Sequence, residues 1–142
     1  MFNLIYRDGA PENAGHYESV KTDGATEYKL GQAICLENGV AKPCGGATNA
    51  SKVYGIVSEP AGAEDDVVVV LKVEGDMIFK CPVTGTAIAS VHKGMKLAIG
   101  TEDYGSVISA AATLDDGKIG AVVAEVLDAA KAGDLIEVRF EN

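Results

Sequence analysis

Residues 29–40 read KLGQAICLENGV, and this stretch decides the fold because the chain repeats its opening later. Residues 93–99 read KGMKLAI, in which a lysine and a glycine again come before an apolar run. In both places a short apolar segment with one glycine follows, and then an aspartate that leads into valine, leucine or isoleucine residues. Two copies of one β unit, at residues 29–74 and 93–140, explain this pattern. Chance similarity between strands punctuated by glycine is the alternative.

The spacing between the copies supports duplication. Equivalent positions lie 63 residues apart at Gly31 and Gly94, 65 apart at Gly55 and Gly120, and 68 apart at Asp66 and Asp134. The drift falls between the strands, and loops tolerate insertions that strands do not.

Turn and strand signals predict an all-β fold. Asn38-Gly39 suits a type I′ hairpin turn, in which both central residues have positive φ. The run at 67–71, VVVVL, is apolar on both faces and predicts a central strand, whereas residues 135–141, LIEVRFE, alternate as a half-exposed strand does. Pro82 must end its strand or lie at a sheet edge. With roughly eight to ten short strands, an antiparallel β-sandwich or small barrel is expected, although residues 106–114 are also compatible with a helix.

Residues 1–27 differ from the rest, because turn-forming residues dominate them. We expect an extended N-terminal arm at 1–27 and one β domain at 28–142. A short apolar patch with one basic residue opens the arm and is the candidate binding segment: Phe2, Leu4, Ile5, Tyr6 and Arg7. The alternative is that this patch forms the first strand of the sandwich.

Composition narrows the function. The chain has 142 residues, which fits one domain, and its net charge of −9 disfavours nucleic acid and anionic membranes as partners. No run approaches the roughly 20 apolar residues of a membrane span, and the first residues lack a secretory signal, so synthesis in a cytoplasm is expected. The cysteines at 35, 44 and 81 are interpreted as reduced packing residues, with a Cys35–Cys44 disulfide as the alternative.

Residues able to carry out catalysis do not form a convincing set. A Cys81/His92 pair is the one arrangement to name, and it lacks flanking glycines and an orienting partner. The acidic run at 64–66 lacks the spacing of a calcium loop. We therefore expect no catalytic residues, no metal site and no cofactor. A biotinyl- or lipoyl-like carrier with a modified Lys96 is a remote alternative, because the turn around Lys96 matches such domains incompletely.

From Tyr28 to the C-terminus the chain resembles the small β-type decoration, or cement, proteins of bacteriophage capsids. The pattern consists of the valine-rich strand, Glu74-Gly75 before an apolar strand, Pro82, a small-residue stretch through Val91, and Lys93-Gly94 leading into Leu97-Ala98-Ile99. Near the end, Gly117-Lys118-Ile119-Gly120 and the final alternating strand also fit. The N-terminal segment of this chain, residues 1–27, is longer and richer in turns than the N-terminal segment of that family.

The resemblance implies a virion protein on the outer surface of an icosahedral head, often a homotrimer, that binds the major capsid protein and stabilises the lattice without catalysis. Phe2, Leu4, Ile5, Tyr6 and Arg7 are then the expected capsid-binding residues. Another virion β module, such as a head fibre base or a tail or baseplate adaptor, is the alternative.

Overall fold

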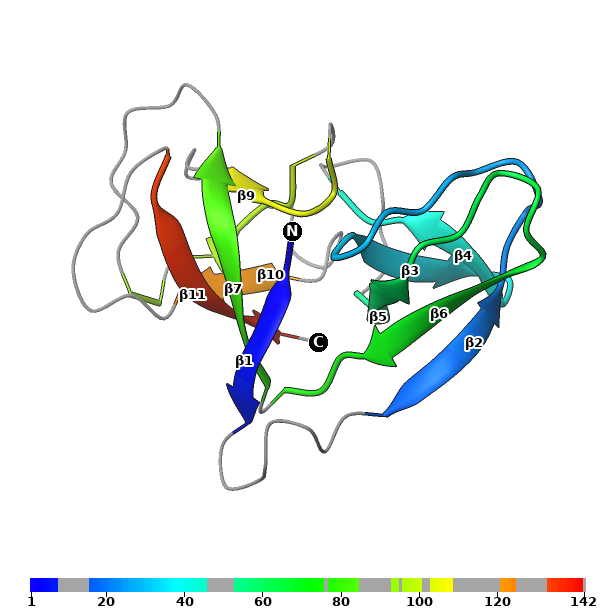
Figure 1. Cartoon of the computed structure of the whole chain (residues 1–142). Coiled ribbons are helices and arrows are strands. Elements are labelled where there is room, and N and C mark those ends of the chain that lie inside the picture. Colours follow the sequence, from blue (N-terminus) through cyan, green and yellow to red (C-terminus); the bar gives the residue numbers. More distant parts are fainter. Residues whose placement is uncertain are drawn as a thin grey trace.

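The computed structural model describes residues 1–7, 16–45, 53–75, 77–84, 93–94, 96–100, 103–108, 121–124 and 133–141. Within these ranges the chain is all-β and contains no helix (Figure 1). Its strands are β1 (Asn3–Arg7), β2 (Tyr17–Lys21), β3 (Ala33–Glu37), β4 (Val40–Pro43), β5 (Gly55–Glu59), β6 (Val67–Lys72), β7 (Met77–Thr84), β8 (Lys96–Leu97), β9 (Val107–Ile108), β10 (Ala121–Ala124) and β11 (Leu135–Glu141). The predicted fold class is confirmed.

The strands form two successive units. Strands β2–β6 close into a small barrel in the order β2-β4-β3-β5-β6. Strands β7–β11 form an open sheet in the order β1-β7-β11-β10-β8, with β9 also paired to β7 and β1 added at one edge. We call β2–β6 the barrel unit and β7–β11 the open unit.

The two units share one pairing scheme. In each, the first strand pairs antiparallel with the last (β2 with β6, β7 with β11) and parallel with the third (β4 and β9). The fourth strand (β5 or β10) pairs antiparallel with the second and the last. The duplication therefore begins earlier than the sequence indicated, at β2 and β7.

The strand registers also match, with one correction. Ile34 lies opposite Gly55 in the barrel unit, and Leu97 lies opposite Val122 in the open unit. Gly55 therefore corresponds to Val122 and not to Gly120. The predicted alignment is wrong by two residues here, a shift that keeps the same face of the strand and is therefore hard to detect from an alternating pattern.

Closure of the sheet distinguishes the units. In the barrel unit a tight turn joins β3 to β4, with φ of 51° at Asn38 and 78° at Gly39, as a type I′ turn requires. In the open unit no pairing between β8 and β9 occurs among the described residues. Instead, the segment between them reaches the barrel unit, where Ala33 N–H donates to the Tyr104 carbonyl at 2.7 Å.

Two hydrophobic cores follow from this arrangement. The first fills the barrel and contains Val20, Tyr28, Ile34, Ala41, Val57, Ala61, Val68 and Val70. The second, which we call the shared core, joins the inner face of the open unit to the outer face of the barrel and contains Phe2, Ala33, Cys35, Cys44, Val53, Ile56, Leu71, Val73, Met77, Phe79, Cys81, Val83, Leu97, Ile99, Ile136, Val138 and Phe140. The outer face of the barrel therefore covers the apolar face of the open sheet.

The predicted arm is a correction. Strand β1 pairs with β7, and β2 pairs with β6 along its whole length. Phe2 is only 2% exposed, and its ring lies edge-on to Phe140 with 5.1 Å between centroids. The boundary at residue 28 is therefore wrong, because both described segments of residues 1–27 belong to the sheets.

Other sequence predictions hold in the described residues. Strand β6 lies between β5 and β2, and β11 alternates buried Ile136, Val138 and Phe140 with more exposed residues. The prediction for Pro82 is wrong, because Pro82 lies within β7 and opposite Leu135, and β7 has β11 on one side and β1 and β9 on the other. Pro82 falls between the last residue paired with β1 and the first paired with β9, so it interrupts neither of these two ladders. The described residues include no helix long and apolar enough to cross a membrane.

Candidate functional site

The predicted binding residues lie in or next to β1. Phe2 is buried in the shared core, so its side chain is not an exposed anchor, and this part of the prediction is wrong. Leu4 is partly buried against the same core, and Ile5 is partly exposed. For Tyr6 and Arg7 the structure gives the backbone pairing, opposite Ile78 and Met77. Phe2 is buried because β1 is a strand of the sheet. The sequence had left this open as the alternative to an exposed binding segment.

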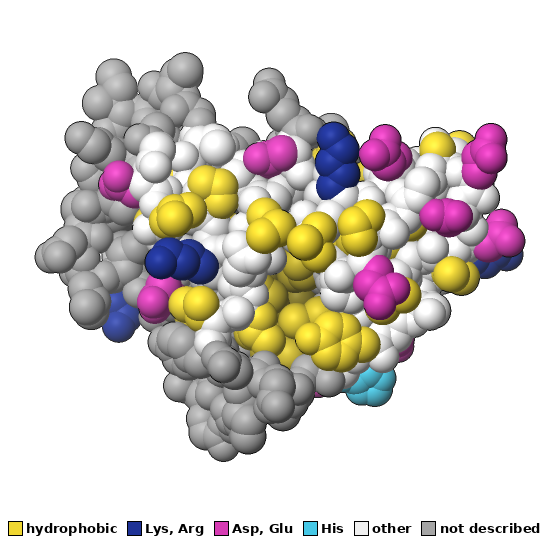
Figure 2. Space-filling view, viewed as in Figure 1, with side chains coloured by type: hydrophobic (Ala, Val, Ile, Leu, Met, Phe, Trp, Pro, Cys, Tyr) yellow, Lys and Arg dark blue, Asp and Glu magenta, His cyan; other side chains and the backbone are white. Residues whose placement is uncertain are grey.

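An apolar groove of about 180 Å³ lies between β1 and the barrel unit. Its walls come from β1 and β7 on one side and from β2, β5, β6 and Leu30 on the other: Phe2, Asn3, Leu4, Tyr17, Leu30, Ile56, Val57, Ser58, Leu71 and Phe79. Figure 2 shows hydrophobic side chains gathered around a hollow at the centre of this face. Among the residues that line the groove, Tyr17 and Leu30 are the large apolar side chains that remain most exposed, at 56% and 49%.

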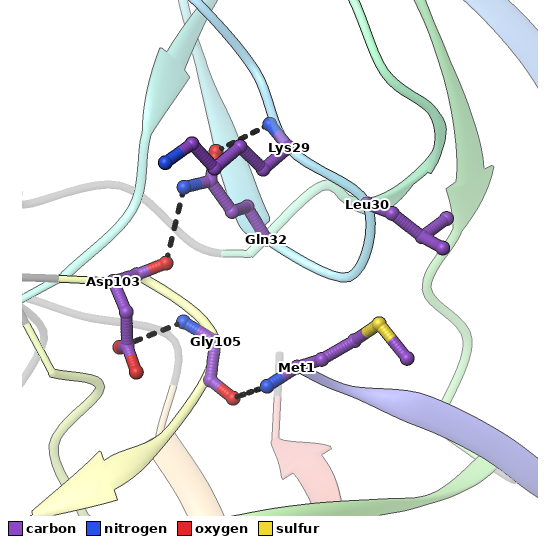
Figure 3. A pocket seen from close by; sticks show the side chains of 6 residues that line it. All are labelled: Met1, Lys29, Leu30, Gln32, Asp103 and Gly105. Atoms are coloured by element: carbon purple, nitrogen blue, oxygen red, sulfur yellow. Dashed lines mark hydrogen bonds between the residues drawn. The ribbon is translucent and has the colours of Figure 1, made fainter.

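A second pocket, of about 220 Å³, adjoins Leu30 (Figure 3). The Met1 α-ammonium donates to the Gly105 carbonyl at 2.5 Å, and Gln32 Nε2 donates to the Asp103 carbonyl at 3.1 Å. Asp103 Oδ1 accepts from the Gly105 N–H at 3.1 Å. The bond from Gln32 to Asp103 joins the turn before β3 to the loop before β9, so the pocket lies where the two units meet.

The cysteines are poor nucleophiles in this setting. Cys35, Cys44 and Cys81 are buried thiols, and burial raises the pKa of Cys81 to about 12. A hydrogen bond with Cys35 raises the pKa of Cys44, and burial raises it further by a smaller amount. A thiol must ionise to attack, so these environments suppress reactivity. His92, the other half of the considered dyad, lies outside the described residues, whereas His16 is exposed.

The remaining candidate groups serve structure. Asp65, in the acidic run, accepts the Gly62 N–H at 2.7 Å through Oδ2 and so closes a turn. No cluster of three or more His, Cys, Asp or Glu side chains with metal-binding geometry occurs in the part of the chain that the structure describes. Lys96 lies in β8 opposite Val123, and not at the hairpin tip where a carrier domain presents its lysine.

No protein-family model matches the chain, and no curated protein has a matching sequence.

Sequence reasoning missed the role of residues 16–21. It assigned them to the arm, whereas β2 is a strand of the barrel unit and places Tyr17 in the groove. The residues YESVK carry no alternation of apolar and polar types that matches their burial, because Tyr17 is exposed and Glu18 is more buried, so no local signal reveals this strand.

Proposed function

We propose that this protein decorates the outer surface of a bacteriophage capsid, binding the major capsid protein of the assembled lattice and stabilising the head. The apolar groove between β1 and the barrel unit carries the proposal, because it offers exposed aromatic and aliphatic side chains on an acidic body with a net charge of −9. Such side chains supply most of the binding energy in protein interfaces. The sequence resemblance gives the proposal its specific class.

Binding to the assembled lattice stabilises it by mass action. A ligand at one hundred times its dissociation constant adds about 2.7 kcal/mol at each site, and a head has many equivalent sites. Modest affinity at the groove is therefore sufficient. Association into a homotrimer on the lattice is part of the proposal, with the symmetry of the head bringing the copies together. Catalysis has no part in this function.

The test compares occupancy of the wild-type protein and variants on heads that lack the protein. Tyr17→Ser with Leu30→Ser removes exposed groove side chains without opening a core, so the domain should fold and occupancy should fall at least about tenfold. Val67→Ser is the matched control, since Val67 is 50% exposed and does not line the groove. The temperature of genome release should fall together with occupancy.

Three results would contradict the proposal. Unchanged occupancy of the double variant would remove the groove from attachment. Wild-type binding to tails or baseplates and not to heads would favour the alternative, a different virion β module. Full occupancy without a change in release temperature would exclude stabilisation.

A further inference from the structure

The duplication exposes a difference between the two units. Lys21 lies opposite Val67, and its counterpart Pro82 lies opposite Leu135. Counting back along the strands, Tyr17 and Ser19 of β2 correspond to Ile78 and Lys80 of β7. This correspondence allows the edges of the two first strands to be compared residue by residue.

On β7 the edge is filled. The Val83 N–H donates to the Asp134 carbonyl, so Val83 faces β11, and by alternation Ile78 and Lys80 face the opposite edge. There they meet β1, with Lys80 opposite Asn3 and Ile78 opposite Tyr6. The added strand leaves Ile78 only 6% exposed.

On β2 the same edge is vacant among the described residues. The Lys72 N–H donates to the His16 carbonyl and the Thr22 N–H to the Asp66 carbonyl, so the backbone groups of His16 and Thr22 face β6. By alternation those of Tyr17 and Ser19 face away from it, and the parallel partner β4 reaches only Lys21. Tyr17 is 56% exposed, in contrast to its counterpart Ile78, and β2 lies at the margin of the molecule (Figure 1).

We propose that the edge of β2 at Tyr17 and Ser19 accepts an extended antiparallel strand from the capsid protein, in the way that β7 accepts β1. This inference rests on the proposed function and names the segment type that it recognises. Edge strands present unpaired N–H and C=O groups in a spacing that only another extended chain matches, and recognition through strand addition is common.

The side chains of β2 indicate which residue types the incoming strand carries. Tyr17 presents its ring on the groove side, where an apolar residue packs. On the other face Glu18 replaces Phe79, the residue that meets Leu4 of β1. The Glu18 carboxylate accepts a hydrogen bond from the Tyr54 hydroxyl. The strand that fits therefore places lysine or arginine where β1 has Leu4.

The first experiment needs only the folded protein and a synthetic probe. The probe is a peptide copying residues 1–8, MFNLIYRD, with Leu4→Lys, and the unmodified peptide is the comparison. In the free protein the amides of Tyr17 and Ser19 should exchange hydrogen faster than those of Ile78 and Lys80. The probe should slow them, and it should bind about two- to fivefold more tightly than the unmodified peptide. Slow exchange in the free protein, or no protection at about 1 mM probe, would overturn the edge site, and equal affinities would overturn the basic residue.

A matched pair of variants tests the edge directly. Ser19→Pro removes an outward N–H, which a sheet edge tolerates, and should weaken probe binding about tenfold or more. Ser19→Ala keeps the N–H and should bind normally. Equal binding by the two variants would overturn the proposal; if Ser19→Pro fails to fold, the exchange measurement decides alone.

Binding of the wild-type protein and the two Ser19 variants to heads distinguishes this inference from the proposed function. If the wild-type protein does not bind heads, the decoration function fails, whatever the peptide does. If the wild-type protein and Ser19→Ala bind heads and folded Ser19→Pro binds equally well, decoration stands and strand addition is wrong. Loss of occupancy with Ser19→Pro alone supports both.

Discussion

Phe2 shows at the scale of one residue how the N-terminus is held. Its ring contacts Phe140 edge-on, and the Phe140 ring centroid in turn lies 5.2 Å from that of Phe79, so the three aromatic rings join the residue before β1 to β7 and β11. We expect Phe2→Ala to lower the free energy of unfolding by about 3–5 kcal/mol, because it removes a buried ring and leaves a cavity. Urea unfolding measures the change. Asn3→Ala, at an exposed neighbour, is the control and should change little; equal effects would indicate that β1 is not anchored by its aromatic residue.

Asp23 is a carboxylate whose charged form is stabilised by hydrogen bonds in the folded protein. Its carboxylate accepts the N–H groups of Ala25 and Thr26, each at 2.9 Å, and receives Lys42 Nζ at 3.3 Å. These bonds, led by the Ala25 N–H, lower its pKa from 3.8 to about 2. A carboxyl group whose pKa is lowered by folding stabilises the folded state at pH values above its pKa in the unfolded chain. This stabilisation is lost as the pH falls toward 2.

Asp23→Asn should therefore lower the melting temperature above about pH 4, and the difference from the wild-type protein should shrink between pH 4 and pH 2. Thermal unfolding across this range measures it. Thr26→Val removes a hydroxyl that donates to Asp23 at 2.9 Å and should raise the Asp23 pKa, which can be followed by NMR titration. A difference that does not change with pH would exclude a contribution from the charge.

At the scale of elements, the β3–β4 hairpin decides whether a unit closes. Gly39 has φ of 78°, and a Cβ there would meet nothing within 4 Å. Gly39→Ala should therefore cost about 1–2 kcal/mol through backbone strain alone. Gly75→Ala is the control, because its Cβ also has open space and its φ lies outside the left-handed region. Chemical denaturation of both variants provides the measurement, and equal stabilities would show that the turn tolerates another conformation.

At the scale of the whole molecule, the shared core should make the two units unfold together. It joins Ile56 and Leu71 of the barrel to Phe79 and Val138 of the open unit, so neither unit buries its apolar surface alone. We expect one calorimetric transition, with an enthalpy of about 100 kcal/mol near 60 °C and equal to the van't Hoff value. Leu71→Ala should shift that single transition. Two separate transitions would mean that the units are independent domains.

The sequence by itself determined the local features of this protein: the all-β class, the Asn38-Gly39 turn, the central β6 and the alternating β11. These depend on backbone preference and on periodicity, which neighbouring residues fix. The duplication was also visible, although its register was two residues off, because such a shift preserves the face of every side chain.

Only the tertiary structure decided where residues 1–7 and 16–21 belong. The two strands there are short and stand next to turn-forming residues, and their partners β7 and β6 lie far along the chain. Pairing at such a distance leaves no local signal. For the same reason the groove appears only when the two units are folded against each other, because it depends on which strand lies beside which.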